Sequence, residues 1–167
     1  MILVAYASRY GSTREVAETI AKVVGGEARL AADVDDLARY DGVVLGGGIY
    51  MGRWHKDARG FVRRFRQELL EVPVALFALG PLDEEAAHWV TAKRQFDAAV
   101  EKLPVDPVDT RLFGGAVDPT NLHFPFNHMP ASDARDWEAI QRFADEVHEA
   151  FSSASAHGEP VGRFDQR

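Results

Sequence analysis

Residues 8–13, SRYGST, gather three hydroxyl side chains, an arginine and a glycine directly after a short apolar run. Hydroxyl groups and free backbone N–H groups at a helix start bind phosphate oxygens, and a glycine lets a ligand approach the backbone closely. The segment favours a phosphate site formed by Ser8, Arg9, Tyr10, Gly11, Ser12 and Thr13. A simpler interpretation stays open, because Ser12 and Glu15 also have the spacing of a capping box, which starts a helix without any ligand.

A second unusual segment, GGGIYMGRWHKD at 46–57, follows another apolar run. Its large apolar groups lie in what we expect to be a surface loop, and such loops often bind planar ligands. The candidate ligand contacts are Gly48, Ile49, Tyr50, Met51, Gly52 and Trp54. Tyr50 or Trp54 is the expected stacking residue; alternatively, both fold back against the next helix. His55 is expected to make a local polar contact.

The segment after the third strong apolar run, LGPLDEE at 79–85, offers a smaller contact. Gly80 and Pro81 predict a turn, and Leu82 is placed to touch the edge of a planar ligand. The alternative is a simple turn in which Asp83 caps the following helix.

Residues 113–133 form an unusually long connection that contains Phe124, Phe126 and Met129 without a clear period. Long loops of this kind are usually lids or binding surfaces. The segment would also serve as an apolar cover for the end of a sheet. Asp133 is the expected cap of the last helix.

Several common reactive sites are missing from the sequence. There is no G-x-x-x-x-G-K-[ST], no G-x-G-x-x-G after the first apolar run and no G-x-S-x-G around Ser8. A phosphoaspartyl receiver needs a carboxylate where this chain has three glycines. The six histidines have no metal-binding spacing, so no metal site is predicted. No nucleophile–base pair is visible, so no catalytic side chain is predicted.

The elements that must position these segments alternate along the chain. Continuous apolar runs at 2–6, 42–47 and 73–79 are typical of strands buried on both faces. Weaker strands are predicted near 27–32 and at 109–117. Helical spacing of apolar residues predicts helices at 13–24, 57–70 and 84–102, and a last helix carries the stripe Trp137, Ile140, Ala144, Val147 and Phe151.

Strand–helix alternation predicts an α/β fold in which helices cover both faces of an open parallel sheet. Ligands of such sheets lie beyond the carboxyl ends of the strands. The four candidate segments all follow strands and therefore belong to one edge. We expect one domain at 1–151 and a frayed tail at 152–167, which is small, polar and contains Pro and Gly.

The composition of the chain narrows the classes of function that remain possible. The chain has 167 residues and a net charge of −7, which argues against broad nucleic-acid binding because that needs a basic surface. It has no cysteine, which excludes disulfides, thiolate catalysis and Cys-held metal clusters. No apolar run approaches the roughly 20 residues of a membrane span. No signal peptide is evident, so we expect a cytoplasmic protein.

The hydroxyl-rich loop and the glycine/aromatic loop together resemble the flavodoxin-like FMN-binding domains over residues 1–150. SRYGST stands where flavodoxins carry T/S-x-T-G-x-T, with Tyr10 in place of the middle Thr. GGGIYMGRWHKDARGFVRRF, FGGAVDP and DARDWEAIQRFADEV are similar to the subgroup that contains the menaquinone-dependent protoporphyrinogen dehydrogenases. Those enzymes carry a longer, basic and apolar insert where this chain has TNLHFPFNHMPAS.

The resemblance implies a flavodoxin-like three-layer sandwich with a five-stranded parallel sheet in the order 2-1-3-4-5. It also implies FMN as the cofactor, with a deazaflavin as an open alternative. Residues 8–13 would hold the phosphate, segments 48–54 and 80–83 would enclose the ring, and the Gly52 peptide would contact N5. The redox chemistry would belong to the cofactor.

Two functions follow from the resemblance. One is an oxidoreductase acting on a small organic substrate such as a quinone or porphyrinogen, which the long loop at 118–130 favours. The other is an electron carrier with a protein partner, which the acidic net charge favours. A domain that has kept the fold and lost the flavin is a third alternative.

Overall fold

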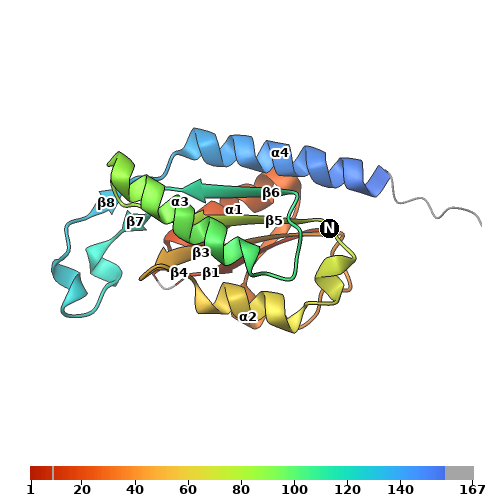
Figure 1. Cartoon of the computed structure of the whole chain (residues 1–167), viewed down its shortest axis with the longest axis horizontal. Coiled ribbons are helices and arrows are strands. Elements are labelled where there is room, and N and C mark those ends of the chain that lie inside the picture. The colour runs from red at the N-terminus through yellow and green to blue at the C-terminus, as the bar shows by residue number, and fades with distance from the viewer. Residues whose placement is uncertain (9, 157–167) are drawn as a thin grey trace, which may run out of the picture.

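The computed structural model describes residues 1–8 and 10–156, which form a mainly parallel sheet between two layers of helices (Figure 1). Five parallel strands follow the order β2-β1-β3-β5-β6. Their bounds are β1 Ile2–Ala7, β2 Glu27–Leu30, β3 Gly42–Tyr50, β5 Val74–Leu79 and β6 Asp109–Phe113. Counting the parallel strands along the chain gives 2-1-3-4-5, so the predicted fold is confirmed.

The apolar runs form strands because both faces of each strand are buried. In β1, Leu3 and Ala5 belong to the core on one side of the sheet, while Val4 and Tyr6 belong to the core on the other. A strand covered on both faces cannot alternate apolar with polar residues, which explains the continuous runs.

Two helices cover each face of the sheet. Helices α1 (Ser12–Val24) and α4 (Trp137–Ala156) pack together on one face, and α2 (Lys56–Arg64) and α3 (Ala86–Glu101) contribute to the core on the other. Short 3-10 turns lie at η1 Ala31–Asp33, η2 Glu68–Leu70, η3 Pro119–Asn121 and η4 Phe126–His128. In Figure 1, α4 lies above the sheet and α2 lies below it.

Two predicted elements are shorter than expected. The helix predicted at 57–70 ends at Arg64 and resumes only as the η2 turn. The strand predicted at 109–117 stops at Phe113, and β7 (Ala116–Val117) instead pairs antiparallel with β8 (Ser132–Asp133). The break falls at Gly114, where a Cβ atom would lie 2.0 Å from the carbonyl oxygen of Ala134.

The last helix also differs from the prediction at both ends. Asp133 is not its cap; it lies in β8, and the Asp136 carboxylate instead accepts the backbone N–H of Ala139 at 3.1 Å. Helix α4 runs to Ala156, so residues 152–156 of the predicted frayed tail are helical. The remainder of that tail, 157–167, lies outside the described residues. Within the described part of the chain, no helix is both long and apolar enough to span a membrane.

Candidate functional site

The loop after β1 is held in a tight turn by its own serine. The Ser8 hydroxyl oxygen accepts the backbone N–H of Gly11 at 2.8 Å. Gly11 has φ 94°, a left-handed conformation that favours glycine, and no atom of the other described residues, its two chain neighbours aside, lies within 4 Å of where its Cβ would be. The backbone at Gly11 is therefore open to a ligand. Tyr10 is exposed beside it, and Arg9 lies outside the described residues.

Helix α1 begins without a cap. Gly11 occupies the N-cap position, and no side chain of the described residues accepts a hydrogen bond from the first turn. The capping-box interpretation of Ser12 and Glu15 is therefore wrong, because Ser12 is already the first helical residue and Glu15 pairs with Arg135. An uncapped helix start presents free N–H groups and the positive end of the helix dipole, which suit an anion.

Thr13 lies in the first turn of α1 and is the only buried polar residue in the part of the chain that the structure describes. It is 2% exposed, and no hydrogen bond joins its hydroxyl to another described residue. No side-chain oxygen or nitrogen of the described residues is both buried and without a hydrogen-bond partner, so the Thr13 hydroxyl oxygen is not sealed from the surface. A hydroxyl that reaches the surface at an open helix start can donate to a phosphate oxygen.

The segment predicted as an open loop after the second strong strand is a β-hairpin. Strand β3 continues to Tyr50, and β4 (Arg53–Trp54) pairs back against it, with Tyr50 opposite Arg53. The two turn residues, Met51 and Gly52, have φ angles of 48° and 75°. Positive φ at both positions is typical of the type I′ turn, which joins two-residue hairpins. Tyr50 is half exposed and Met51 is 85% exposed.

Replacing Met51 with asparagine is expected to raise the free energy of unfolding by about 0.5–1 kcal/mol, because asparagine tolerates the left-handed region better than methionine. Urea denaturation of the protein without cofactor measures the change. Gly52→Ala is the control with the opposite sign, since φ 75° favours glycine. A destabilising Met51→Asn would mean that the turn in solution has another conformation.

Trp54 is not available to stack on a ligand. Its side chain is 1% exposed, its indole Nε1–H donates to the carbonyl oxygen of Gly47 at 3.0 Å, and its ring meets Phe96 edge-on with centroids 5.9 Å apart. The prediction of Trp54 as a stacking residue is therefore wrong, and the alternative that it folds back is confirmed. His55 behaves as predicted: its Nδ1 accepts the backbone N–H of Asp57 at 3.1 Å. Ile49 is half buried against the same core.

The loop after β5 is tied to the loop after β6. The N–H of Gly80 donates to Phe113 O at 2.9 Å, and the N–H of Gly115 donates to Pro81 O at 2.7 Å. A Cβ at Gly115 would lie 2.9 Å from Gly80 O. Leu82 follows this turn at the same edge of the sheet, and its side chain is exposed.

Residues 118–131 project beyond the carboxyl edge of the sheet from the β7–β8 ribbon (Figure 1). Phe124 is 79% exposed, and Met129 is also exposed. Phe124 therefore does not form an apolar cover on the sheet. Together with Tyr50, Met51 and Leu82, the two residues give this edge several exposed apolar side chains.

The sequence analysis did not single out Arg135, which lies between β8 and α4. Its side chain is 10% exposed and bonds Asp133, Glu15 and the carbonyl oxygen of Ser12. The hydrogen bonds from Arg135 hold the pKa of Asp133 below its ordinary value. The Asp-x-Arg spacing was visible in the sequence, but the contact with α1 was not.

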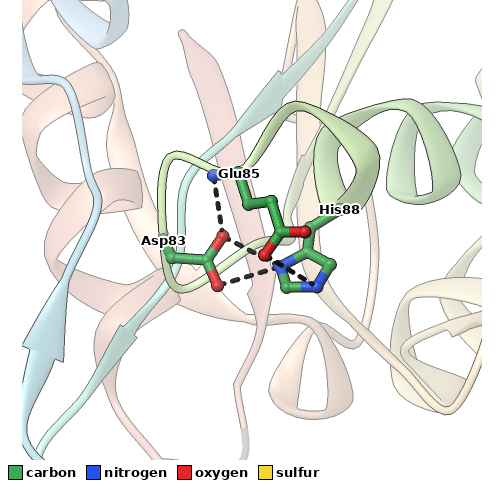
Figure 2. A group of neighbouring side chains, drawn as sticks. All are labelled: Asp83, Glu85 and His88. Atoms are coloured by element: carbon green, nitrogen blue, oxygen red, sulfur yellow. Dashed lines mark hydrogen bonds and ion pairs between the residues drawn. The ribbon is translucent and has the colours of Figure 1, made fainter.

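A second unpredicted group spans the loop after Leu82 and the first turn of α3 (Figure 2). The His88 Nδ1 lies 2.9 Å from the Asp83 carboxylate, and its Nε2 lies 3.6 Å from Glu85. Asp83 also accepts the N–H of Glu85 at 3.0 Å, but Glu85 is the N-cap residue of α3, so Asp83 is not that helix's cap. The three side chains offer metal ligand atoms within 4.8 Å of one another; all are exposed, and both ring nitrogens face carboxylates.

The Asp83–His88 pair is expected to stabilise the protein only between two pH limits. The hydrogen bond that protonated His88 donates to the Asp83 carboxylate raises the pKa of His88 above its ordinary value near 6.5, so this stabilisation is full below about pH 6.5 and is lost as the pH rises through the raised pKa. The pKa of Asp83 is lowered mainly by the same bond, so stabilisation is also lost in strong acid.

An NMR titration of His88 tests the first limit, with Asp83→Asn expected to return its pKa toward 6.5. The stability difference between wild type and His88→Gln should be larger at pH 6 than at pH 9. Asp97→Asn, which breaks the Lys93 pair on the same helix, should show no such change between these pH values. A His88 pKa at or below the ordinary value would contradict the pairing.

Comparisons with known proteins agree with this architecture. The model of the flavodoxin domain family matches residues 3–129. A Leishmania major protein named protoporphyrinogen IX dehydrogenase (quinone) is 28% identical over an alignment of 170 residues. The alignment covers 85% of this chain and 72% of that protein.

Among solved structures, oxidised Flavodoxin 1 from Bacillus cereus has a TM-score of 0.53 and 16% identity, covering 89% of this chain and 97% of its own. Two-electron reduced flavodoxin from Megasphaera elsdenii has a TM-score of 0.54 and 16% identity, covering 89% and 99%. These two likenesses show the fold.

The sheet order and the open helix start at its carboxyl edge define a flavodoxin-like α/β protein. The family match spans most of the sequence, and the chain belongs to the flavodoxin domain family. This membership indicates a flavin cofactor and redox chemistry.

Proposed function

We propose that this protein binds FMN in its domain at residues 1–151 and uses it to oxidise or reduce a small planar organic substrate, such as a quinone or a porphyrinogen. The observation that carries FMN binding is the start of α1, where an uncapped helix N-terminus lies beside the hydroxyl of Thr13. Bound FMN would supply hydride or electron transfer, while the chain binds and orients it.

The residues at the edge of the sheet fit the parts of FMN. Ser12 and Thr13 would hold the phosphate with hydroxyl and N–H groups, and Gly11 leaves room for it. Tyr50 and Leu82 have exposed apolar surface for the ring, and they follow neighbouring parallel strands, β3 and β5. Gly48, Ile49, Gly52, Gly80 and Pro81 would contribute backbone contacts.

Two observations support an organic substrate. Exposed apolar side chains, including Met51 and Phe124, occur on the segments at the edge where the ring would lie, and such a surface suits an apolar planar molecule. The Leishmania major relative is named for a porphyrinogen substrate and a quinone. A cytoplasmic location stays a prediction.

The second candidate function is an electron carrier that hands electrons to a protein partner. The net charge of −7 and the exposed carboxylates of Asp83 and Glu85 beside Leu82 favour it, because they would steer a basic partner to this edge.

Titration of FMN with the purified full chain tests the proposal. We expect the flavin fluorescence to be quenched with a saturable one-to-one end point. A colourless preparation that quenches no FMN fluorescence would refute both functions. With FMN bound, quinone turnover that far exceeds reduction of cytochrome c supports the oxidoreductase, and the reverse supports the carrier.

A further inference from the structure

The Arg135 side chain joins two parts of the chain that are far apart in sequence. Its guanidinium donates from Nε and Nη2 to the two oxygens of Asp133 at 2.9 and 2.8 Å. Its Nη1 donates to Glu15 and, at 3.3 Å, to the carbonyl oxygen of Ser12. The flat face lies over the Trp137 ring, 4.9 Å from the centroid. With 10% of its surface exposed, this side chain has little freedom to move.

All contacts of Arg135 on α1 fall within the first turn of that helix. Ser12 is the first helical residue, and Glu15, three residues further on in the same first turn, faces the guanidinium. On the other side, Asp133 belongs to the β7–β8 ribbon from which residues 118–131 project. Arg135 therefore fixes the helix start relative to the base of that projecting segment. Bidentate guanidinium–carboxylate pairs have defined geometry and are well suited to this role.

We propose that Arg135 is a positioning residue for the phosphate loop: it holds the first turn of α1 so that the N–H groups after Gly11 and the Thr13 hydroxyl converge on one phosphate. This inference rests on the proposed FMN binding. The first turn has no side-chain cap among the described residues, so its geometry depends on contacts from elsewhere. Arg135 provides such contacts through the carbonyl of Ser12 and the carboxylate of Glu15.

A simple charge effect makes a different prediction from positioning. Arg135 adds a positive charge near the phosphate, whereas Asp133 and Glu15 add negative charges. If only charge mattered, Arg135→Gln would weaken FMN binding and Asp133→Asn would strengthen it. If Arg135 positions the loop, both variants weaken binding, because Asp133 supplies two of the bonds that orient the guanidinium.

The test compares FMN with riboflavin, which has the same ring and no phosphate, by fluorescence titration of the full chain. Arg135→Gln and Arg135→Lys are expected to weaken FMN binding about tenfold or more, the size of a lost hydrogen bond, and to leave riboflavin affinity within about twofold. Asp133→Asn is expected to weaken FMN binding in the same direction. Amide hydrogen exchange at residues 15–18, whose N–H groups are the first to be bonded inside α1, should accelerate in all three variants without any ligand.

Arg111 offers a matched control. It also pairs with the aspartate two positions before it, Asp109, and with a glutamate, Glu146, and it lies over an aromatic ring, that of Phe143. These contacts join β6 to α4, and none of them involves the described residues of the phosphate loop, so Arg111→Gln should leave both flavin affinities and the exchange at 15–18 unchanged.

Equal loss of FMN and riboflavin affinity in Arg135→Gln, or stronger FMN binding in Asp133→Asn, would overturn the positioning role. If the wild type binds neither flavin, the proposed function fails, while the exchange measurement still decides whether Arg135 holds the loop.

Discussion

Replacing Gly46 with alanine is expected to lower the free energy of unfolding by about 3 kcal/mol, because overpacking of a rigid core is costly. A Cβ at this position would lie 2.0 to 2.3 Å from three ring carbons of Phe77. The ring cannot move aside easily, since Phe77 is fully buried and packs against Phe113 and Phe143 with centroids 6.0 and 6.3 Å away. Urea denaturation of the protein without cofactor measures the change.

Gly48→Ala is the control on the same strand. The nearest atom to a Cβ there is Leu79 O at 3.9 Å, so this change should shift stability by less than about 1 kcal/mol. In a Phe77→Leu background, the additional cost of Gly46→Ala should fall, which a double-mutant cycle would record as a coupling between the two sites. Equal effects of the Gly46 and Gly48 substitutions would show that the Phe77 ring yields freely.

The same glycines show where sequence reasoning fails. In the sequence, three glycines, Gly46, Gly47 and Gly48, end a predicted strand and precede aromatic residues. This pattern is also typical of a loop that a ligand approaches closely. In the structure, Gly46 accommodates Phe77, and Gly47 accommodates Trp54, whose Nε1 would lie 3.2 Å from an added Cβ. The partner that requires a glycine comes from another strand or from across a hairpin turn, and no local pattern identifies it.

The alternation of buried strands and helices was accessible from the sequence for a different physical reason. Burial on both faces leaves a continuous apolar run, as in β1 and β5, and helical periodicity between such runs implies parallel crossovers of one hand. These signals are local and repeated. The order 2-1-3-4-5 then came from the family resemblance. The split of the last strand at Gly114 was missed because the reason for it, the backbone of Ala134, lies beyond a long loop.

The sequence predicted where the candidate site lies, but it did not predict the contacts that hold the site in place. Residues 8 and 10–13 do lie at the carboxyl edge of the sheet, and Thr13 is 2% exposed there. The predicted capping box was wrong because it rested on local spacing alone. Ser12 and Glu15 would show the same interval in any helical turn. Glu15 is in fact committed to Arg135, which is far along the chain. A salt bridge of that span leaves no periodic trace in one sequence.

Removing the two hydroxyls at the start of α1, by Ser12→Ala together with Thr13→Val, is expected to weaken FMN binding about 100-fold. Hydrogen bonds to a charged group contribute about 1.5–3 kcal/mol each, so losing two of them predicts an effect of this size or larger. Valine keeps the branched shape of Thr13, and the hydroxyl that it removes has no hydrogen bond to another described residue, so the free energy of unfolding without FMN should change by less than about 1 kcal/mol. Fluorescence titration and urea denaturation measure the two quantities.

Thr19→Val supplies the matched control, because its hydroxyl bonds the carbonyl of Glu15 within the same helix, one turn beyond the phosphate loop. It should leave FMN affinity unchanged. Riboflavin affinity should not change in either variant, since riboflavin has no phosphate for Ser12 or Thr13 to bind. If the double variant loses stability in step with FMN affinity, or loses riboflavin as strongly as FMN, the hydroxyls support the helix rather than the phosphate, and the start of α1 is not the anion site.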